Sequence, residues 1–186
     1  MVKIKRGLDI PITGAPSPQI SDMSSVRSVA IVGADYVGMM PTMKVAEGDR
    51  VLKGQSLFAD KKNPQVIFTA PVTGRVRAIN RGARRVFQSL VIDCEANSTE
   101  SVSFKSYNRE QLVHLNRDGV IEQLVASGLW TALRTRPFSK IPNPDSTPSA
   151  IFVNAMDTNP LAIDPQIVIQ QEQAAFEDGL ALVSKL

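Results

Sequence analysis

Short apolar runs separated by residues that favour turns dominate the segment that ends near Cys94. Each run has the length of one strand, and glycine, proline, asparagine or aspartate bounds most of them. The runs lie at 29–32, 42–45, 56–58, 65–69, 74–79 and 89–92. This pattern predicts a small all-β unit over about residues 29–95. Residues 1–28 carry several prolines and are predicted to form an irregular N-terminal arm.

The predicted β unit contains an internal repeat. Residues 42–48 match residues 76–82, so that Gly48 aligns with Gly82. Two copies are too few for a solenoid, which needs at least three stacked units, and instead predict a sandwich with a pseudo-two-fold axis. We expect both glycines at equivalent turns where the backbone angle φ is positive.

Helical patterns begin after Cys94. Asn108 and Gln111 have the spacing of a capping box, and Asp118 is a second candidate for a helix N-cap. Apolar residues at helical spacing follow at Val120, Ile121, Leu124 and Val125. Gly128 is expected to end that helix. Residues 96–149 are therefore predicted as a helical linker that ends in a proline-rich loop.

The segment 150–186 has the pattern of a β–α unit. Residues 150–155 form a continuous apolar run typical of a buried parallel strand, and a helix is predicted from Gln171. Because one parallel strand cannot form a sheet, we expect the chain to be the front part of a longer protein. We also expect its uncovered apolar residues to leave the segment poorly ordered or paired with a second copy. They are Leu161, Ile163, Phe176, Leu180 and Val183.

Composition narrows the class of protein. Hydrophobic residues make up 43% and charged residues 21% of the 186 residues, which is typical of a globular chain. With only 5% aromatic residues, the core is expected to consist of aliphatic side chains and methionine. Apolar runs long enough to span a bilayer are absent from the sequence. One cysteine, Cys94, and one histidine, His114, give no disulfide and no grouped ligands for zinc or iron.

Two strings in the β unit resemble biotinyl and lipoyl carrier domains. They are EGDRVLKGQ at residues 47–55 and APVTGRV at residues 70–76. The resemblance implies a barrel-sandwich hybrid fold. In such carriers the modified lysine lies on a hairpin tip seven residues before the alanine of the Ala-Pro pair, and here that position is Asn63. Lys61 and Lys62 are adjacent and are interpreted as a solvated turn, so a carrier function without the modified lysine stays an alternative.

Several irregular strings, in order along the whole chain, resemble the A subunit of the bacterial Na+-translocating NADH:quinone oxidoreductase. They are IKRGLDIPI at 4–12, YVGMMPTM at 36–43, GLWTALRTRPFSK at 128–140 and AMDTNPLA at 155–162. This resemblance implies an α+β protein: a biotinyl/lipoyl-like β sandwich, then helices, then the truncated start of a Rossmann-like α/β domain at 150–186.

The same resemblance implies a role. The complex transfers electrons from NADH to ubiquinone and exports Na+, using FAD, FMN, riboflavin and an iron–sulfur centre. The resemblance implies that the A subunit binds no redox cofactor and lies at the cytoplasmic face of the inner membrane, without a transmembrane segment. Its expected partners are the other subunits of the complex, with ubiquinone as a candidate ligand. This N-terminal portion alone is expected to be non-catalytic.

Candidate ligand or docking residues follow from a comparison with the flavin-binding subunit of respiratory complex I, whose domain order is similar. Its glycine-rich loop binds the FMN phosphate, whereas this chain has WTALRTR at residues 130–136. Bulky Trp130 and Leu133 would fill the space that a phosphate needs, which indicates a lost flavin site. The candidates are Trp130, Arg134, Arg136, Phe138, Asp157 and Asn159.

Each candidate has a simpler interpretation. Trp130 and Phe138 would fill the space between the preceding helix and the strand predicted at 150–155, and Asp157 and Asn159 would cap a turn. If that strand belongs to an open α/β sheet, Asp157 and Asn159 instead follow its carboxyl end, where ligands bind.

The chain is mildly basic, with a net charge of +3. The densest cluster of cationic residues is Arg75, Arg77, Arg81, Arg84 and Arg85. A nucleic-acid-binding module is a third possibility, but aromatic residues for base stacking are scarce near this cluster, which argues against it. A protected strand edge or a docking surface for an acidic partner or anionic lipid explains the cluster better.

Overall fold

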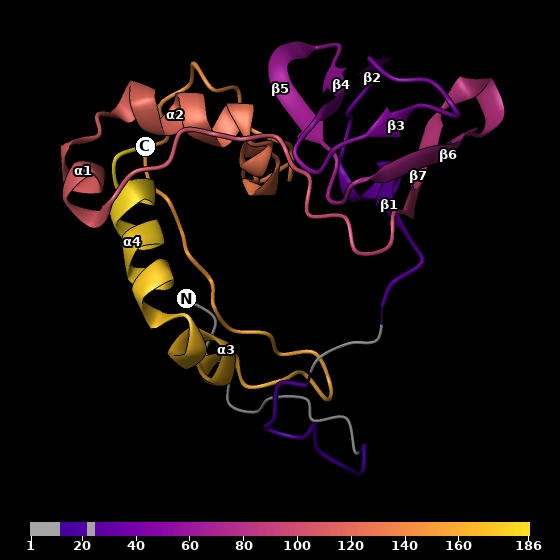
Figure 1. The fold of residues 1–186 in the computed structure, drawn as a ribbon. Helices are drawn as coiled ribbons and strands as arrows, with labels where there is room; N and C mark the ends of the chain where they lie inside the picture. Colours follow the sequence, from indigo (N-terminus) through magenta and orange to yellow (C-terminus); the bar gives the residue numbers. More distant parts are fainter. Residues whose placement is uncertain (1–11, 22–24) are drawn as a thin grey trace.

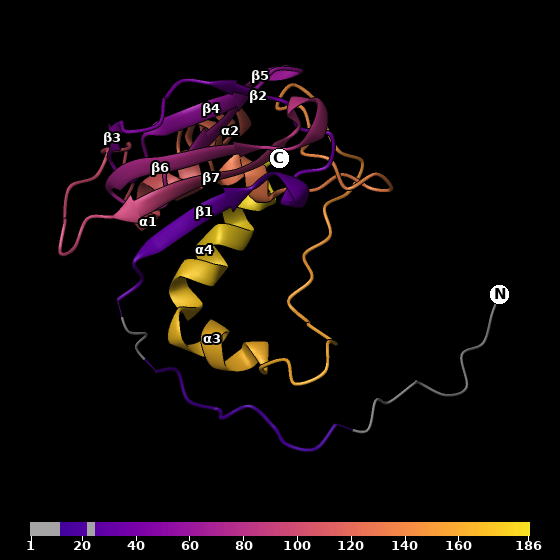
Figure 2. The ribbon, with the colours of Figure 1, turned by 90° about the vertical axis from the view of Figure 1, so that its right-hand side faces the viewer.

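The computed structural model describes residues 12–21 and 25–186, and most of the string at 4–12 lies outside them. Its β unit is built from two antiparallel sheets (Figures 1 and 2). One sheet has the order β1 (Ser28–Val32), β7 (Phe87–Cys94), β6 (Gly74–Arg81), β3 (Arg50–Val51). The other has the order β2 (Pro41–Met43), β4 (Ser56–Asp60), β5 (Asn63–Thr69). The predicted strands are present. Strand β3 was not predicted, because two residues are too few to give a pattern in the sequence.

Strand β6 shows why the sequence folds this way. Its residues alternate between the core and solvent, with Gly74 and Val76 buried and Arg75 and Arg77 exposed. A Cβ atom at Gly74 would lie 2.0 Å from the carbonyl oxygen of Asp93 on β7. Only glycine therefore lets these two strands approach at this point.

The core of the β unit contains more aromatic side chains than the composition led us to expect. Phe58 stacks on Phe68 with ring centroids 4.5 Å apart, and Phe87 meets Phe58 edge-on. All three are buried together with aliphatic residues of both sheets. The expectation of an aliphatic core holds for most of this cluster, because Val, Leu, Ile and Ala outnumber its aromatic residues.

The internal repeat is visible in the strand pairing. Thr42 pairs with Ala59 in the first half, and Val76 pairs with Ile92 at the equivalent point of the second. Gly48 has a φ of +91° as expected, but Gly82 has a φ of −90°. The expectation was wrong for Gly82, because the second half closes locally through a 3-10 turn, η2 (Ala83–Arg85), and places positive φ on its arginines.

Two helices follow the β unit. Helix α1 (Arg109–His114) begins at the predicted capping box, in which the Gln111 amide donates to the Asn108 side chain at 2.8 Å. Helix α2 (Arg117–Ala126) is capped by Asn116, so the assignment of Asp118 as N-cap was wrong and Asp118 lies in the first turn. The N-caps Asn108 and Asn116 fix the starts of α1 and α2. Gly128, with a φ of +80°, follows the end of α2 as predicted.

The strand predicted at 150–155 does not form. These residues are extended, exposed and without a ladder partner. The chain crosses from the upper helices to α3 (Pro165–Gln171) and returns through α4 (Gln173–Val183) (Figure 1). The helix predicted from Gln171 is present as α4. Helix α3 was not predicted, and it begins at an Asp164 cap followed by Pro165.

Helix α4 contacts α1 through charged side chains. The ammonium group of Lys185, just after α4, donates to the carbonyl oxygens of Leu112, Val113 and Leu115 at the end of α1. Arg109 adds an ion pair to Asp178 at 3.0 Å. Of the apolar residues expected to remain uncovered, Leu161, Ile163 and Leu180 are exposed, whereas Phe176 and Val183 are half-buried.

Arg109 also forms an ion pair with Glu177 at 3.3 Å. A hydrogen bond from the Gln173 side chain, followed by the contact with Arg109, lowers the pKa of the Glu177 carboxyl. The ionised carboxylate of Glu177 thus helps to hold α4 against α1.

Candidate functional site

The segment that follows α2 is anchored to the β unit by Trp130. This residue lies in a short 3-10 helix, η3 (Leu129–Ala132), and its indole is 3% exposed within the core cluster. The indole Nε1–H donates to the carbonyl oxygen of Pro142 at 2.9 Å. Trp130 therefore packs between the sheets and the helices, and not against residues 150–155 as the simpler interpretation had it.

Close packing at Gly128 fixes where this segment starts. The Thr69 hydroxyl of β5 donates to the carbonyl oxygen of Ser127 at 2.9 Å. A Cβ atom at Gly128 would lie 2.5 Å from that hydroxyl oxygen. Glycine is required here by both the positive φ and the contact with β5.

The backbone of the same segment leaves little room for an anion. The Thr131 amide donates to the carbonyl oxygen of Gly128, and the Leu133 amide donates to that of Trp130. A phosphate cradle needs successive N–H groups that point at the ligand. These amides are already used within the turn.

Arg134 is engaged with the protein itself. Its guanidinium donates to the carbonyl oxygens of Thr131 and Leu133, and it lies over the Tyr36 ring with its central carbon 5.2 Å from the ring centroid. Tyr36 in turn meets Phe68 of the core edge-on. Arg134 therefore acts as a link between the loop after η3 and the loop before β2.

The remaining candidates are exposed. Phe138 is 69% exposed, so the interpretation of Phe138 as a filler of internal space was wrong. Arg136 is exposed beside it. Asp157 accepts hydrogen bonds from the backbone and side-chain N–H groups of Asn159, which is the geometry of a local turn. Asp157 and Asn159 lie on the exposed segment that leads to α3.

The structure brings together two lysines that the sequence did not connect. Lys140 lies against Gly38: a Cβ atom added to Gly38 would be 3.7 Å from the Cε of Lys140. The ammonium group of Lys140 is 5.9 Å from the ring centroid of Phe138. Lys62, in the turn between β4 and β5, donates to the carbonyl oxygen of Gly38 at 3.3 Å. Lys140 and Lys62 thus meet at a loop that lies far from both in the sequence.

The turn at Lys61 and Lys62 is exposed, which confirms its interpretation as a solvated hairpin. Asn63 begins β5 directly after it. Whether this tip carries any modification stays a prediction.

The basic cluster is partly neutralised. Arg77 forms an ion pair with Asp93 at 3.1 Å, and Arg75 donates to the carbonyl oxygen of Gly48. Arg84 and Arg85 are exposed, and both have a positive φ. The cluster lies along the solvent side of β6 and the turn that follows it.

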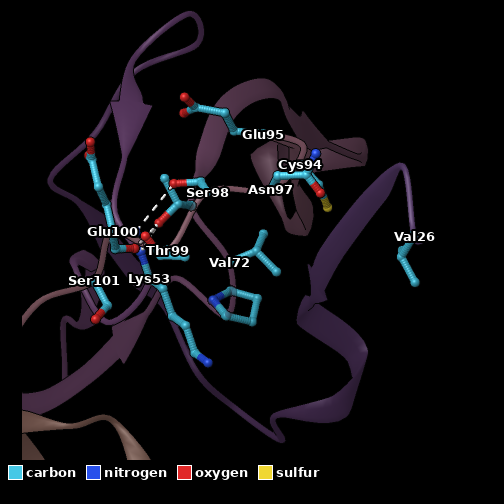
Figure 3. Close-up of a pocket in the computed structure, with 12 residues that line it drawn as sticks. Val26, Lys53, Val72, Cys94, Glu95, Asn97, Ser98, Thr99, Glu100 and Ser101 are labelled. Carbon is cyan, nitrogen blue, oxygen red and sulfur yellow. Dashed lines mark hydrogen bonds between the residues drawn. The ribbon is translucent and has the colours of Figure 1, made fainter. Parts of the chain in front are cut away.

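A hollow lies where β7 ends and the chain leaves the β unit (Figure 3). Its volume is about 430 Å³, and Lys53, Thr73, Cys94 and the segment 97–101 line much of it. The Thr73 hydroxyl accepts from the Lys53 amide and donates to the carbonyl oxygen of Glu100. These polar groups hold the segment in place, and Cys94 is half-buried beside them.

An exposed ion-pair network fastens the same end of the unit. Arg50 bonds Glu95 and Glu100, each at 2.9 Å. The hydrogen bonds that Arg50 donates to the carboxylates of Glu95 and Glu100 raise the pKa of its guanidinium above the ordinary value. The role of the network is to hold the strand β3 to the segment after β7.

Two further observations bear on the expectations. Among residues 12–21 and 25–186, no helix is both long enough and apolar enough to cross a membrane. In that part of the chain no three His, Cys, Asp or Glu side chains gather as metal ligands. The expected lack of a bound metal or redox cofactor stays a prediction.

Comparisons with known proteins cover both parts of the chain. Residues 2–95 match the family described as the NqrA N-terminal barrel-sandwich hybrid domain, and residues 115–186 match the NqrA second alpha/beta domain. The A subunit of the Na(+)-translocating NADH-quinone reductase of Klebsiella pneumoniae (strain 342) is 60% identical over all 186 residues of this chain. The corresponding protein of Pasteurella multocida (strain Pm70) is 58% identical over the same length. The chain spans 41% of each of these relatives.

Proposed function

Because the chain belongs to the NqrA family, the A subunits of the Na(+)-translocating NADH-quinone reductases, we propose that it serves that complex as a cofactor-free, peripheral part. In this role it supports electron transfer from NADH to ubiquinone, coupled to Na+ export, by docking on the other subunits. It supplies surfaces and not redox chemistry.

The position of Trp130 carries this proposal. The indole fills the space beside β5 where a flavin phosphate would need a glycine-lined turn, and Thr131 and Leu133 use their amides within the turn. The guanidinium of Arg134 is directed to backbone carbonyl groups and to Tyr36. A phosphate would have to displace each of these contacts, which supports a binding and scaffolding role.

Flavin content tests the cofactor-free role. The full-length protein and this chain are each purified, and the visible absorbance band that is typical of an oxidised flavin is compared with the protein concentration. We expect flavin far below one molecule per chain, and no oxidation of NADH. A stoichiometric flavin that stays bound through purification would contradict the proposal.

Reconstitution tests the supporting role. Membranes that contain the reductase without NqrA are supplemented with full-length NqrA, and NADH:ubiquinone reductase activity is measured. We expect activity to return with the full-length protein. Unchanged activity in its presence would contradict a supporting role, whatever the flavin content.

A further inference from the structure

Three loops that are distant in the sequence meet at one end of the β unit. The first, 36–40, precedes β2; the second is the turn between β4 and β5; the third, 135–141, follows η3. Their meeting is fixed by the Arg134–Tyr36 contact and by backbone hydrogen bonds, such as that from the Lys61 amide to the carbonyl oxygen of Met40 at 2.7 Å. We name the outer face of these loops the three-loop surface, and it consists of Val37, Met40, Lys61, Lys62, Phe138 and Lys140.

The three-loop surface combines exposed apolar side chains with cations. Phe138 is 69% exposed, Val37 51% and Met40 48%. Lys62 and Lys140 both line a hollow of about 230 Å³ between the first and third loops. Large apolar side chains exposed together are typical of an interaction site.

The charges of this surface are not neutralised within the protein. Across residues 12–21 and 25–186, no ion pair involves Lys61, Lys62 or Lys140. Asp60 lies in the same hollow, but its carboxylate is directed to the backbone amides of Met40 and Lys62, each at 3.2 Å. The surface is therefore cationic and complementary to a carboxylate-bearing partner.

We propose that the three-loop surface docks a segment of a partner protein that carries carboxylates next to an apolar side chain. The apolar side chain contacts Phe138 and Val37, and the carboxylates pair with Lys62 and Lys140. This inference rests on the proposed role of the chain as a peripheral part of the reductase, and it identifies the face by which the chain meets the rest of the complex.

The shape of the surface favours a protein segment over a lipid headgroup layer. The ammonium groups flank a hollow, whereas a membrane surface is met best by a projecting face. The hollow is also lined by Asn63 and Asn143, whose amide groups can bond a peptide backbone, and by the acidic Asp60.

Binding to the reductase purified without NqrA tests the proposal. Full-length NqrA carrying both K62Q and K140Q is compared with the unmodified protein, and the affinity for this probe is measured by biolayer interferometry. Because two exposed ion pairs would be lost, we expect the affinity to fall about ten-fold. The loss should shrink as the salt concentration rises. A variant carrying K62R and K140R keeps the charges and should bind with nearly the affinity of the unmodified protein.

Lys105→Gln is the matched control. Lys105 is also an exposed lysine, but it pairs with Glu122 at 3.0 Å on a different part of the chain. This variant should bind the probe with unchanged affinity. All variants replace exposed side chains, so an unchanged melting temperature will show that each remains folded.

Zero-length cross-linking with a carbodiimide identifies the partner group. The reagent converts a carboxyl group into an activated ester. The lysine amine attacks this ester and forms an amide bond, and the reagent leaves as a urea. We expect Lys62 or Lys140 to be joined to an aspartate or glutamate of a neighbouring polypeptide in the assembled reductase.

The remaining outcomes separate the hypotheses. If the double glutamine variant binds like the unmodified protein, the three-loop surface is not the docking face, and the proposed function stands. If it instead loses binding to vesicles that contain phosphatidylglycerol while keeping its affinity for the reductase, the surface binds lipid and the proposal is overturned. If unmodified NqrA fails to bind the probe, the proposed peripheral role fails and this inference fails with it.

Discussion

Replacing Trp130 should separate the helices from the β unit, because this side chain joins them. Truncation of a buried Trp to Ala costs about 3–5 kcal/mol, and an indole that is 3% exposed lies in that range. Trp130→Phe keeps much of the buried surface and removes the hydrogen bond to Pro142, so its cost should be only about 1–2 kcal/mol. The two variants therefore divide the contribution of Trp130 into packing and hydrogen bonding.

Urea unfolding followed by far-ultraviolet circular dichroism measures both costs. Trp130 is the only tryptophan of the chain, so its fluorescence can be used only for the unmodified protein. There it should emit at short wavelength when folded and shift to longer wavelength as the indole meets water. A cost for Trp130→Ala below about 1 kcal/mol, or equal costs for the two variants, would refute the assignment of Trp130 as a buried anchor.

Three further predictions concern single positions. Gly128→Ala should destabilise the protein by about 2–4 kcal/mol in urea unfolding, because the cost of a positive φ adds to a clash between the new Cβ and Thr69. In Gly48→Ala the new Cβ has no atom within 4 Å, so only the positive φ contributes and the cost should be about 1–2 kcal/mol. Lys185→Met should cost about 1–2 kcal/mol and increase amide hydrogen exchange at the end of α1, whose carbonyl groups lose their donor. Folding lowers the pKa of Glu177, so the stability that its carboxylate gives to the folded protein is fully present above the ordinary pKa of a glutamate. That contribution is lost as the pH falls through the lowered pKa. Glu177→Gln should therefore make the melting temperature less dependent on pH below about pH 4.

The β unit could be predicted because its information is local. Each predicted strand is bounded by turn residues, and the strands pair antiparallel with neighbours that the chain itself supplies. The fold class and the resemblance to the A subunit are confirmed by the family matches and by relatives 55–60% identical over the whole chain. The assignment of Gly82 to a positive φ failed because two sequence copies with matching residues can close by different turns.

The strand at 150–155 could not be judged from its sequence. An apolar run such as that from Ile151 to Val153 has the composition of a buried parallel strand, but a strand forms only when another strand lies beside it. No partner strand lies beside it in the described part of this chain, so Phe152 is 88% exposed and Asp157 follows no sheet edge. The role given to Asp157 and Asn159 depended on that sheet and has no structural support here.

The three-loop surface could not be predicted from the sequence, for a different reason. Phe138 and Arg134 were both candidate docking residues, yet the sequence could not reveal that Phe138 is exposed and that Arg134 is bound to Tyr36. Lys62 was interpreted only as part of a solvated turn, and Lys140 only as the end of the string at 128–140, so nothing in the sequence joined the two lysines. Only the fold brings these two lysines together. The β unit places the Lys62 turn beside Gly38, and Trp130 holds the segment that carries Lys140 beside the same glycine. A surface assembled in this way is detectable only after the core that positions its loops is known.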